Sequence, residues 1–139
     1  MLNTKVCVLL TILFVASILS LKPTAMADPI IKVPSDYSTI QGAINAANNG
    51  ATIQVSAQTY NENLVVNKVL SIVGENSETT IIDGGLKGTV VDVYANNVLI
   101  SGFTIRNSGV GTTDFYSGIR VRSSYANIVI SGNIIANYC

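Results

Sequence analysis

Aromatic and charged side chains that suit sugar binding occur together in one part of the sequence. Phe115 and Tyr116 lie in an eight-residue segment, Val110 to Ser117, and Arg120 follows shortly after. An aromatic ring offers a large contact area with a polar tip, and a guanidinium group offers five N–H donors. We therefore predict that this segment and the strand after it contact carbohydrate. The predicted ligand-binding residues are Asp114, Tyr116, Arg120 and Arg122.

A competing interpretation concerns Phe115, whose ring would pack back onto the body of the protein. We favour packing for this residue, because aromatic rings bury large areas. Loops that emerge from a rigid scaffold are also where binding residues concentrate. The segment is therefore a candidate contact surface, and retention on polysaccharide resins would test it.

No metal or cofactor is predicted for these residues. Calcium needs several oxygen ligands around one ion, and we interpret the widely spaced Asp83, Asp92 and Asp114 as solvated turn carboxylates. The chain has no histidine, and beyond residue 27 it has no methionine and one cysteine, Cys139. The usual ligands of copper, zinc and haem are therefore missing.

An internal repeat must position the candidate residues. The 22 residues from Gly88 to Gly109 resemble the 22 residues from Gly118 to Cys139, with Val110 to Ser117 between them. Such repetition is typical of a solenoid, in which each repeat buries its apolar face against its neighbours. Equivalent asparagines would then stack in ladders at turns, and the expected pairs are Asn97 with Asn127 and Asn107 with Asn137.

Short alternating segments predict strands on either side of one helix. A strand is expected over Ile30 to Val33, and a helix over Tyr37 to Gly50 with a capping box from Ser38 to Gln41. This helix would cover the open end of the stack. Each repeat copy holds three strands of three to five residues, which describes one coil of a parallel β-helix with coils about 4.8 Å apart. The alternative is an antiparallel β-sandwich, which does not explain a repeat in register.

The alignment of the two copies makes one geometric prediction. Asp92 and Arg122 occupy the same outward position, so their side chains should lie one coil apart on the outer face. As an exposed pair they would contribute under about 1 kcal/mol.

Residues 1–27 have the features of an export signal, and residues 28–139 form the single expected domain. Lys5 precedes a 16-residue apolar run, and a small-residue site predicts cleavage between Ala27 and Asp28. The alternative is a membrane anchor, but a spanning helix needs about 20 apolar residues. Residues 28–139 carry 6 basic and 8 acidic side chains, a net charge of −2. We expect no nucleic-acid partner, and no membrane partner after cleavage.

Three segments resemble the pectin-lyase-like superfamily, and most closely the NosD-type periplasmic β-helix repeat domains. They are Asp36 to Asn63, Ile72 to Gly74 and Thr80 to Gly84. The resemblance implies an all-β fold: a right-handed parallel β-helix of about four coils with a short N-terminal capping α-helix. The superfamily includes pectate lyases, pectin methylesterases, polygalacturonases and non-catalytic proteins. Copper binding is not carried over from the NosD group, because the ligands are missing.

No catalytic residue can be carried over from these enzymes. Ser117 stands where the pectin methylesterases have a glutamine, and their first catalytic aspartate would fall just beyond Cys139. Calcium would come into question only if further coils were lyase-like. The second copy ends at Cys139 without a closing cap, which predicts that the natural protein is longer.

Two functions remain at this point. The first is an exported, non-catalytic scaffold, secreted, periplasmic or at the cell surface, that contacts polysaccharide or a cell-surface glycan. The alternative is the N-terminal part of a polysaccharide-degrading enzyme of the pectate lyase or pectin esterase type, with its catalytic coils downstream. Assays on pectic substrates with and without calcium would separate the two.

Overall fold

The computed structural model describes residues 29–111 and 115–136. The predicted signal with its cleavage site at Ala27 and Asp28, the loop residue Asp114, and Asn137 to Cys139 lie outside these ranges. The described residues form twelve strands and one short helix, in this order along the chain: β1 (Ile30–Val33), α2 (Ile40–Ala46), β2 (Thr52–Val55), β3 (Thr59–Tyr60), β4 (Leu64–Val66), β5 (Ser71–Gly74), β6 (Ile81–Asp83), β7 (Val91–Val93), β8 (Val98–Ser101), β9 (Thr104–Arg106), β10 (Ile119–Val121), β11 (Ile128–Ser131) and β12 (Ile134–Ala136).

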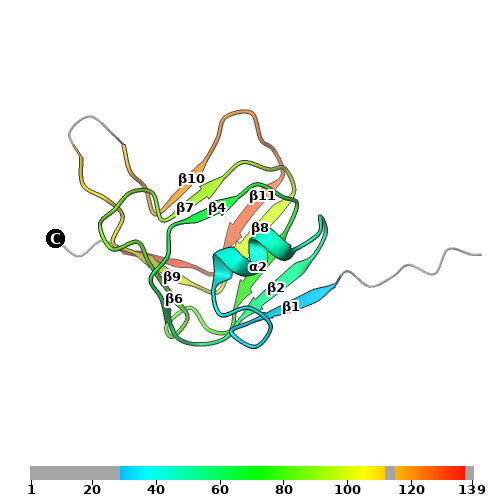
Figure 1. Cartoon of the computed structure of the whole chain (residues 1–139). Helices are drawn as coiled ribbons and strands as arrows, with labels where there is room; N and C mark the ends of the chain where they lie inside the picture. Colours follow the sequence, from blue (N-terminus) through cyan, green and yellow to red (C-terminus); the bar gives the residue numbers. More distant parts are fainter. Residues whose placement is uncertain (1–28, 112–114, 137–139) are drawn as a thin grey trace, which may run out of the picture.

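Three parallel sheets surround a common interior (Figure 1). Their strand orders are β1-β2-β5-β8-β11, β10-β7-β4 and β12-β9-β6-β3, and every recorded strand pair is parallel. From β2 onward the chain visits the three sheets in the same cyclic order, which is compatible with a parallel β-helix. The all-β, parallel part of the prediction is confirmed, and the antiparallel sandwich is wrong.

Inward-facing aliphatic side chains from the three sheets form the core. Ile53, Ile72 and Ile100 are register partners on adjacent strands of the first sheet, and all are buried. Ile82 and Ile105 stack in the same way in the sheet that contains β6 and β9. Complete burial of one such side chain contributes about 1.5–3 kcal/mol. The repeat therefore stabilises the fold because the buried aliphatic side chains of each coil pack against those of the next.

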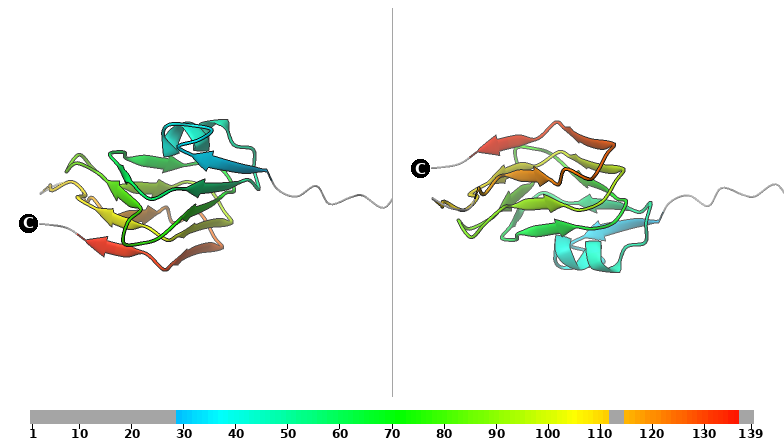
Figure 2. Two further views of the ribbon diagram at one scale, coloured as in Figure 1. Left: turned by 90° about the horizontal axis from the view of Figure 1, so that it is seen from below. Right: turned by 90° about the horizontal axis from the view of Figure 1, so that it is seen from above.

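Helix α2 lies over one end of the stack, and β12 lies at the other (Figure 2). Its residues Ile40, Ala43 and Ile44 are buried, as the predicted capping role requires. The helix is shorter than predicted, however, and the Ser38–Gln41 capping box is wrong. Thr39 is the N-cap, and its hydroxyl oxygen accepts a hydrogen bond from the Gly42 N–H at 3.0 Å.

Side chains from the segment around β4 hold both ends of α2. The Glu62 carboxylate accepts hydrogen bonds from the N–H groups of Ile40 and Gln41, both at 2.9 Å. The Lys68 ammonium donates to three carbonyl oxygens at the other end, those of Ile44, Asn45 and Ala47. An anion at the N-terminus and a cation at the C-terminus of a helix both interact favourably with the helix dipole. This explains why a helix of seven residues is stable here.

The two repeat copies contain three strands each, as predicted, but their register is not uniform. Ile128 pairs with Val98 and Ile134 with Thr104, a spacing of 30 residues, whereas Arg120 pairs with Asp92 at a spacing of 28. The turn at 122–127 is two residues longer than the turn at 94–97, so the placement of Arg122 opposite Asp92 is wrong. Because side chains alternate with a period of two, this shift keeps Arg120 and Arg122 on the face that carries Asp92.

One of the two predicted asparagine ladders is present in the described residues. The Asn127 amide donates a hydrogen bond to the Asn97 Oδ1 at 3.0 Å. Their φ angles of 59° and 53° lie in the left-handed region, which asparagine tolerates better than most residues. Asn107 has a φ of 55° as well, whereas its predicted partner Asn137 lies outside the described ranges.

Candidate functional site

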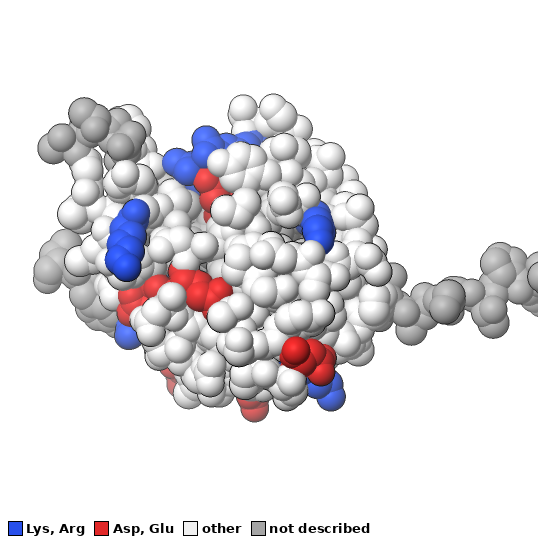
Figure 3. Space-filling view, in the orientation of Figure 1, with Lys and Arg blue, Asp and Glu red and all other residues white. Residues whose placement is uncertain are grey.

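The candidate site lies on the outer face of the sheet formed by β4, β7 and β10. Asp92 is the middle residue of β7, Arg120 is the middle residue of β10, and Arg122 follows β10 directly. Basic and acidic atoms gather over β7 and β10 in the space-filling view (Figure 3). The structure thus brings together two of the four residues predicted to bind a ligand.

Both guanidinium groups bind the same carboxylate. Arg120 donates to Asp92 Oδ1 from Nε at 3.2 Å and to Oδ2 from Nη2. Arg122 donates to Oδ1 from Nε at 3.2 Å and to Oδ2 from Nη2 at 3.0 Å. The prediction that the Asp92 and Arg122 side chains lie one coil apart on the outer face is therefore confirmed, although the register on which it rested is wrong and the pair is not fully exposed, because Asp92 is buried.

Tyr94, which follows β7 directly and comes two residues after Asp92, completes the cluster. Its hydroxyl donates to Asp92 Oδ2 at 3.1 Å and accepts from Arg122 Nη2 at 2.6 Å. The Arg122 guanidinium carbon also lies 4.8 Å from the centroid of the Tyr94 ring, close enough for a cation–π interaction. Tyr94 was not among the residues predicted from the sequence. Its spacing of two residues from Asp92 was the available signal.

Asp92 is buried, with 7% of its surface exposed, so its interpretation as a solvated turn carboxylate is wrong. Burial by itself raises the pKa of the Asp92 carboxyl. Hydrogen bonds from the two guanidinium groups and Tyr94, with the charge of Arg120, outweigh burial and hold the pKa below its ordinary value of 3.8. The carboxylate therefore stays ionised at neutral pH.

Asp83 is the second buried carboxylate, 9% exposed, at the end of β6. It accepts hydrogen bonds from Arg106 Nε at 2.8 Å, from the Asn107 amide at 3.0 Å and from the Gly85 N–H at 3.0 Å. Burial raises the pKa of the Asp83 carboxyl, but these hydrogen bonds and the charge of Arg106 lower it further than burial raises it. Its interpretation as a solvated carboxylate is wrong as well.

The predicted loop residues fall in different environments. Tyr116 is 37% exposed, and its ring packs on the backbone of Gly88 and Gly109, where a Cβ added to Gly109 would come within 2.7 Å of it. Phe115 is 89% exposed. The prediction that the Phe115 ring packs onto the body of the protein is therefore wrong. The Tyr116 ring packs there instead. Asp114 lies outside the described residues.

Within the described ranges, no three acidic, histidine or cysteine residues form a group that could hold a metal ion. The same ranges contain no helix with the length and apolar character to cross a membrane. The oxygens of Asp83 and Asp92 already accept hydrogen bonds from positively charged donors. The geometry suits the binding of an anion by guanidinium groups better than proton transfer or metal binding.

The fold and site define a class of protein: a parallel β-sheet stack, closed at one end by a helix, that presents a paired-arginine cluster on one sheet. Searches of protein-family models, curated proteins and solved structures return no match to this chain.

Proposed function

We propose that the protein is an exported, non-catalytic scaffold, secreted, periplasmic or at the cell surface, that contacts an anionic glycan through Arg120 and Arg122. Its fold would be a right-handed parallel β-helix of about four coils. The cyclic order of the sheets supports this fold, because parallel strands joined by crossovers are right-handed in nearly all proteins. The apolar leader at residues 1–27 supports export.

The sharing of one carboxylate by two arginines is the observation that carries the proposal. A guanidinium group has five N–H donors, and the hydrogen bonds of Arg122 to Asp92 and Tyr94 use its Nε and Nη2. The Arg122 side chain is 41% exposed. Arg122 therefore has a further nitrogen with which to bind a carboxylate or sulfate group of a glycan.

The neighbouring loop supports carbohydrate as the ligand. Tyr116 precedes β10 in the sequence, with two residues between them, and is partly exposed. Phe115, next to it, is almost fully exposed. Exposed aromatic rings provide stacking area for sugar rings, and these two precede Arg120 by only a few residues in the chain. Tyr116 is firmly placed by its contact with Gly88 and Gly109, which reduces the ordering that binding would require.

The state of the carboxylates supports a non-catalytic role for the described residues. A general acid or base needs a pKa near the working pH and access to substrate. Asp83 and Asp92 are buried, their pKa values are lowered, and their oxygens are bound by arginine. If the protein degraded polysaccharide, residues other than Asp83 and Asp92 would have to act as the acid and the base.

Affinity electrophoresis of the full chain tests the proposal. Mobility should be retarded in gels that contain polygalacturonate or alginate and unchanged in gels that contain dextran. We expect Arg122→Gln to weaken retardation about tenfold, the effect of losing one charge-assisted contact of about 1.4 kcal/mol. Lys32→Gln removes an exposed positive charge from β1, which belongs to a different sheet, and should change retardation less than about twofold.

Equal retardation of the wild type and Arg122→Gln, or equal retardation by dextran, would overturn the proposal. Each sample should also be assayed for new reducing ends and for unsaturated products, with and without calcium. Depolymerisation would replace the scaffold role by that of a polysaccharide-degrading enzyme.

A further inference from the structure

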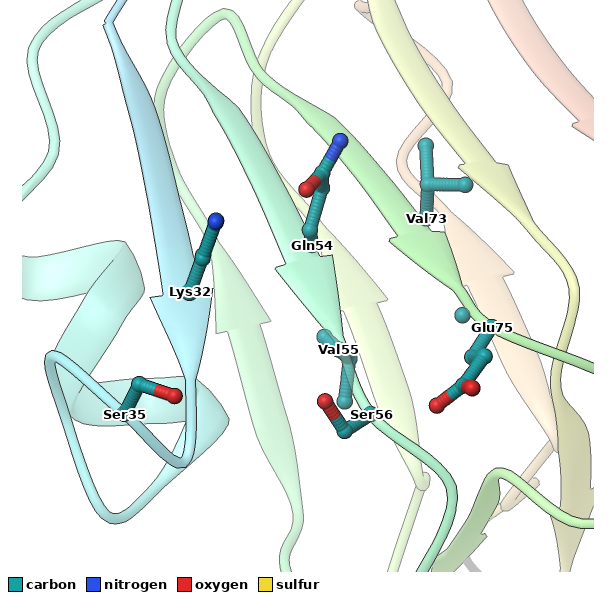
Figure 4. Close-up of a pocket in the computed structure, with 8 residues that line it drawn as sticks. Lys32, Ser35, Gln54, Val55, Ser56, Val73 and Glu75 are labelled. Carbon is teal, nitrogen blue, oxygen red and sulfur yellow. The ribbon is translucent and has the colours of Figure 1, made fainter.

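An open hollow lies on a different sheet from the arginine cluster, where β1, β2 and β5 end. Its volume is about 470 Å³, within the range of small-molecule sites. Three short segments line it, one from each strand and the residues that follow (Figure 4): Lys32 and Ser35; Gln54, Val55 and Ser56; Val73, Gly74 and Glu75. Because neighbouring strands in register supply these segments, the hollow is part of the stack.

Opposite charges occupy the two sides of this hollow. Lys32 comes from β1, Glu75 follows β5, and β2 lies between them (Figure 4). No ion pair joins Lys32 to Glu75 in the part of the chain that the structure describes. The hollow therefore offers an ammonium group on one side and a carboxylate on the other, both exposed to solvent.

Neutral hydrogen-bonding groups lie between the two charges. Gln54 is the register partner of Lys32 on one side and of Val73 on the other, so the three side chains form one row across the sheet. Ser35 lies on the β1 side of the hollow, near Lys32, and Ser56 follows β2 between Ser35 and Glu75 (Figure 4). A ligand in this hollow would meet the Gln54 amide and the Ser56 hydroxyl between the two charges, and the methyl groups of Val73 beside Gln54.

The backbone around the hollow is held in place by hydrogen bonds. Asp36 accepts from the Lys32 N–H at 2.7 Å, and the Asp36 N–H donates to the Lys32 carbonyl at 2.8 Å. Glu75 Oε2 accepts from the Ala57 N–H at 2.9 Å, which orients the carboxylate and leaves Oε1 for another donor. A site that is already ordered loses less entropy when a ligand binds.

We propose that this hollow binds a small zwitterion of dipeptide size, with its carboxylate on Lys32 and its ammonium group on Glu75. Lys32 and Glu75 are two strands apart, about 9.6 Å, and two residues apart along the strand direction, about 6.6 Å. In Figure 4 the Lys32 side chain runs back along β1 and the Glu75 carboxylate lies toward the strand ends, so the side chains do not shorten the separation along the strands. The two Cα atoms are therefore about 12 Å apart. An extended dipeptide spans at most about 7 Å, and a hydrogen bond of about 2.9 Å at each end extends its reach to about 13 Å. A neutral polyol would use the hydroxyls and amide but neither charge. This site is independent of the proposed glycan contact.

NMR titration of the full chain with glycylglycine tests this inference. The amide signals of Gln54, Ser56 and Glu75 should shift and saturate. The uncharged analogue N-acetylglycinamide, succinate with two negative charges, and 1,4-diaminobutane with two positive charges should bind at least fivefold more weakly. Lys32→Gln and Glu75→Gln should each weaken glycylglycine binding at least fivefold.

Two controls keep the result specific. Glu75→Gln retains an oxygen that accepts from Ala57, so a loss of binding with an unchanged spectrum elsewhere is due to the charge. Lys87→Gln, which removes an exposed charge outside the hollow, should leave the titration unchanged. The inference is overturned if glycylglycine causes no saturable shift, if N-acetylglycinamide binds equally well, or if Lys32→Gln binds like the wild type.

Discussion

Asp83 and Asp92 are both buried, outward-facing strand residues that bind arginine from the next coil, yet their surroundings differ. Asp83 has one arginine and completes its hydrogen bonds with an amide side chain and a backbone N–H. Asp92 has two arginines and a tyrosine hydroxyl. The first is a structural clamp between neighbouring coils. The second also brings two guanidinium groups together at the surface, which is why we assign ligand binding to it.

The physical reason for this difference lies in charge compensation. A buried carboxylate without a partner is strongly unfavourable, and one well-placed arginine already compensates it. The second arginine at Asp92 is therefore not needed to keep that carboxylate ionised. The pKa of both carboxyls is lowered in either arrangement, so the extra arginine adds positive charge at the surface.

The largest effect is expected from Asp92→Ala. This change leaves Arg120 and Arg122, whose side chains are 33% and 41% exposed, without the carboxylate that they share. It should lower the free energy of unfolding by about 2–3 kcal/mol, less than for a fully buried pair because water partly solvates the two arginines. Urea unfolding followed by circular dichroism measures it. Glu78→Ala, which removes an exposed carboxylate, should stay within about 0.5 kcal/mol of the wild type. A similar value for both variants would show that the cluster does not contribute to stability.

An effect of intermediate size is expected in the pH dependence of the free energy of unfolding. Because the folded-state pKa values of Asp83 and Asp92 are lowered, their stabilisation is complete above the unfolded pKa of about 3.9. It is lost as pH falls through the lower folded values. Urea unfolding from pH 6 downward should therefore show stability declining below about pH 4. Asp83→Asn should make that decline shallower, and an identical slope would contradict the clamp.

The smallest effect is expected from Glu62→Gln. Glu62 serves as the reference because its carboxylate binds backbone N–H groups and not an arginine. Glu62 binds two N–H groups at the start of α2, and the substitution keeps one acceptor oxygen but removes the charge from the helix N-terminus. We expect a loss of about 1 kcal/mol in the free energy of unfolding. Differential scanning calorimetry can measure it against Glu78→Gln. A loss as large as that of Asp92→Ala would remove the distinction between paired and unpaired carboxylates.

The repeat was sufficient to predict the three strands per copy and the Asn97–Asn127 ladder, and the helical spacing of apolar residues in 37–50 was sufficient to predict the helix at the end of the stack. It was not sufficient for the candidate site, because Arg120 and Asp92 differ by two positions from their alignment in the two copies. That shift arises in a turn whose added length has no distinctive sequence signal. The capping of α2 by Glu62 depends on a contact across 22 residues, which local patterns do not reveal. Burial of Asp83 and Asp92 was missed for the same reason, since residues one coil away cover them.

The most direct test of the central claim compares an arginine from each cluster. Arg122→Gln and Arg106→Gln each remove one guanidinium group that binds a buried aspartate. Titration calorimetry with an acidic oligosaccharide, on samples shown to be folded by circular dichroism, should give binding about tenfold weaker for Arg122→Gln. Arg106→Gln should bind within about twofold of the wild type. Equal losses in the two variants, or no loss in Arg122→Gln, would contradict the assignment of ligand binding to the Asp92 cluster.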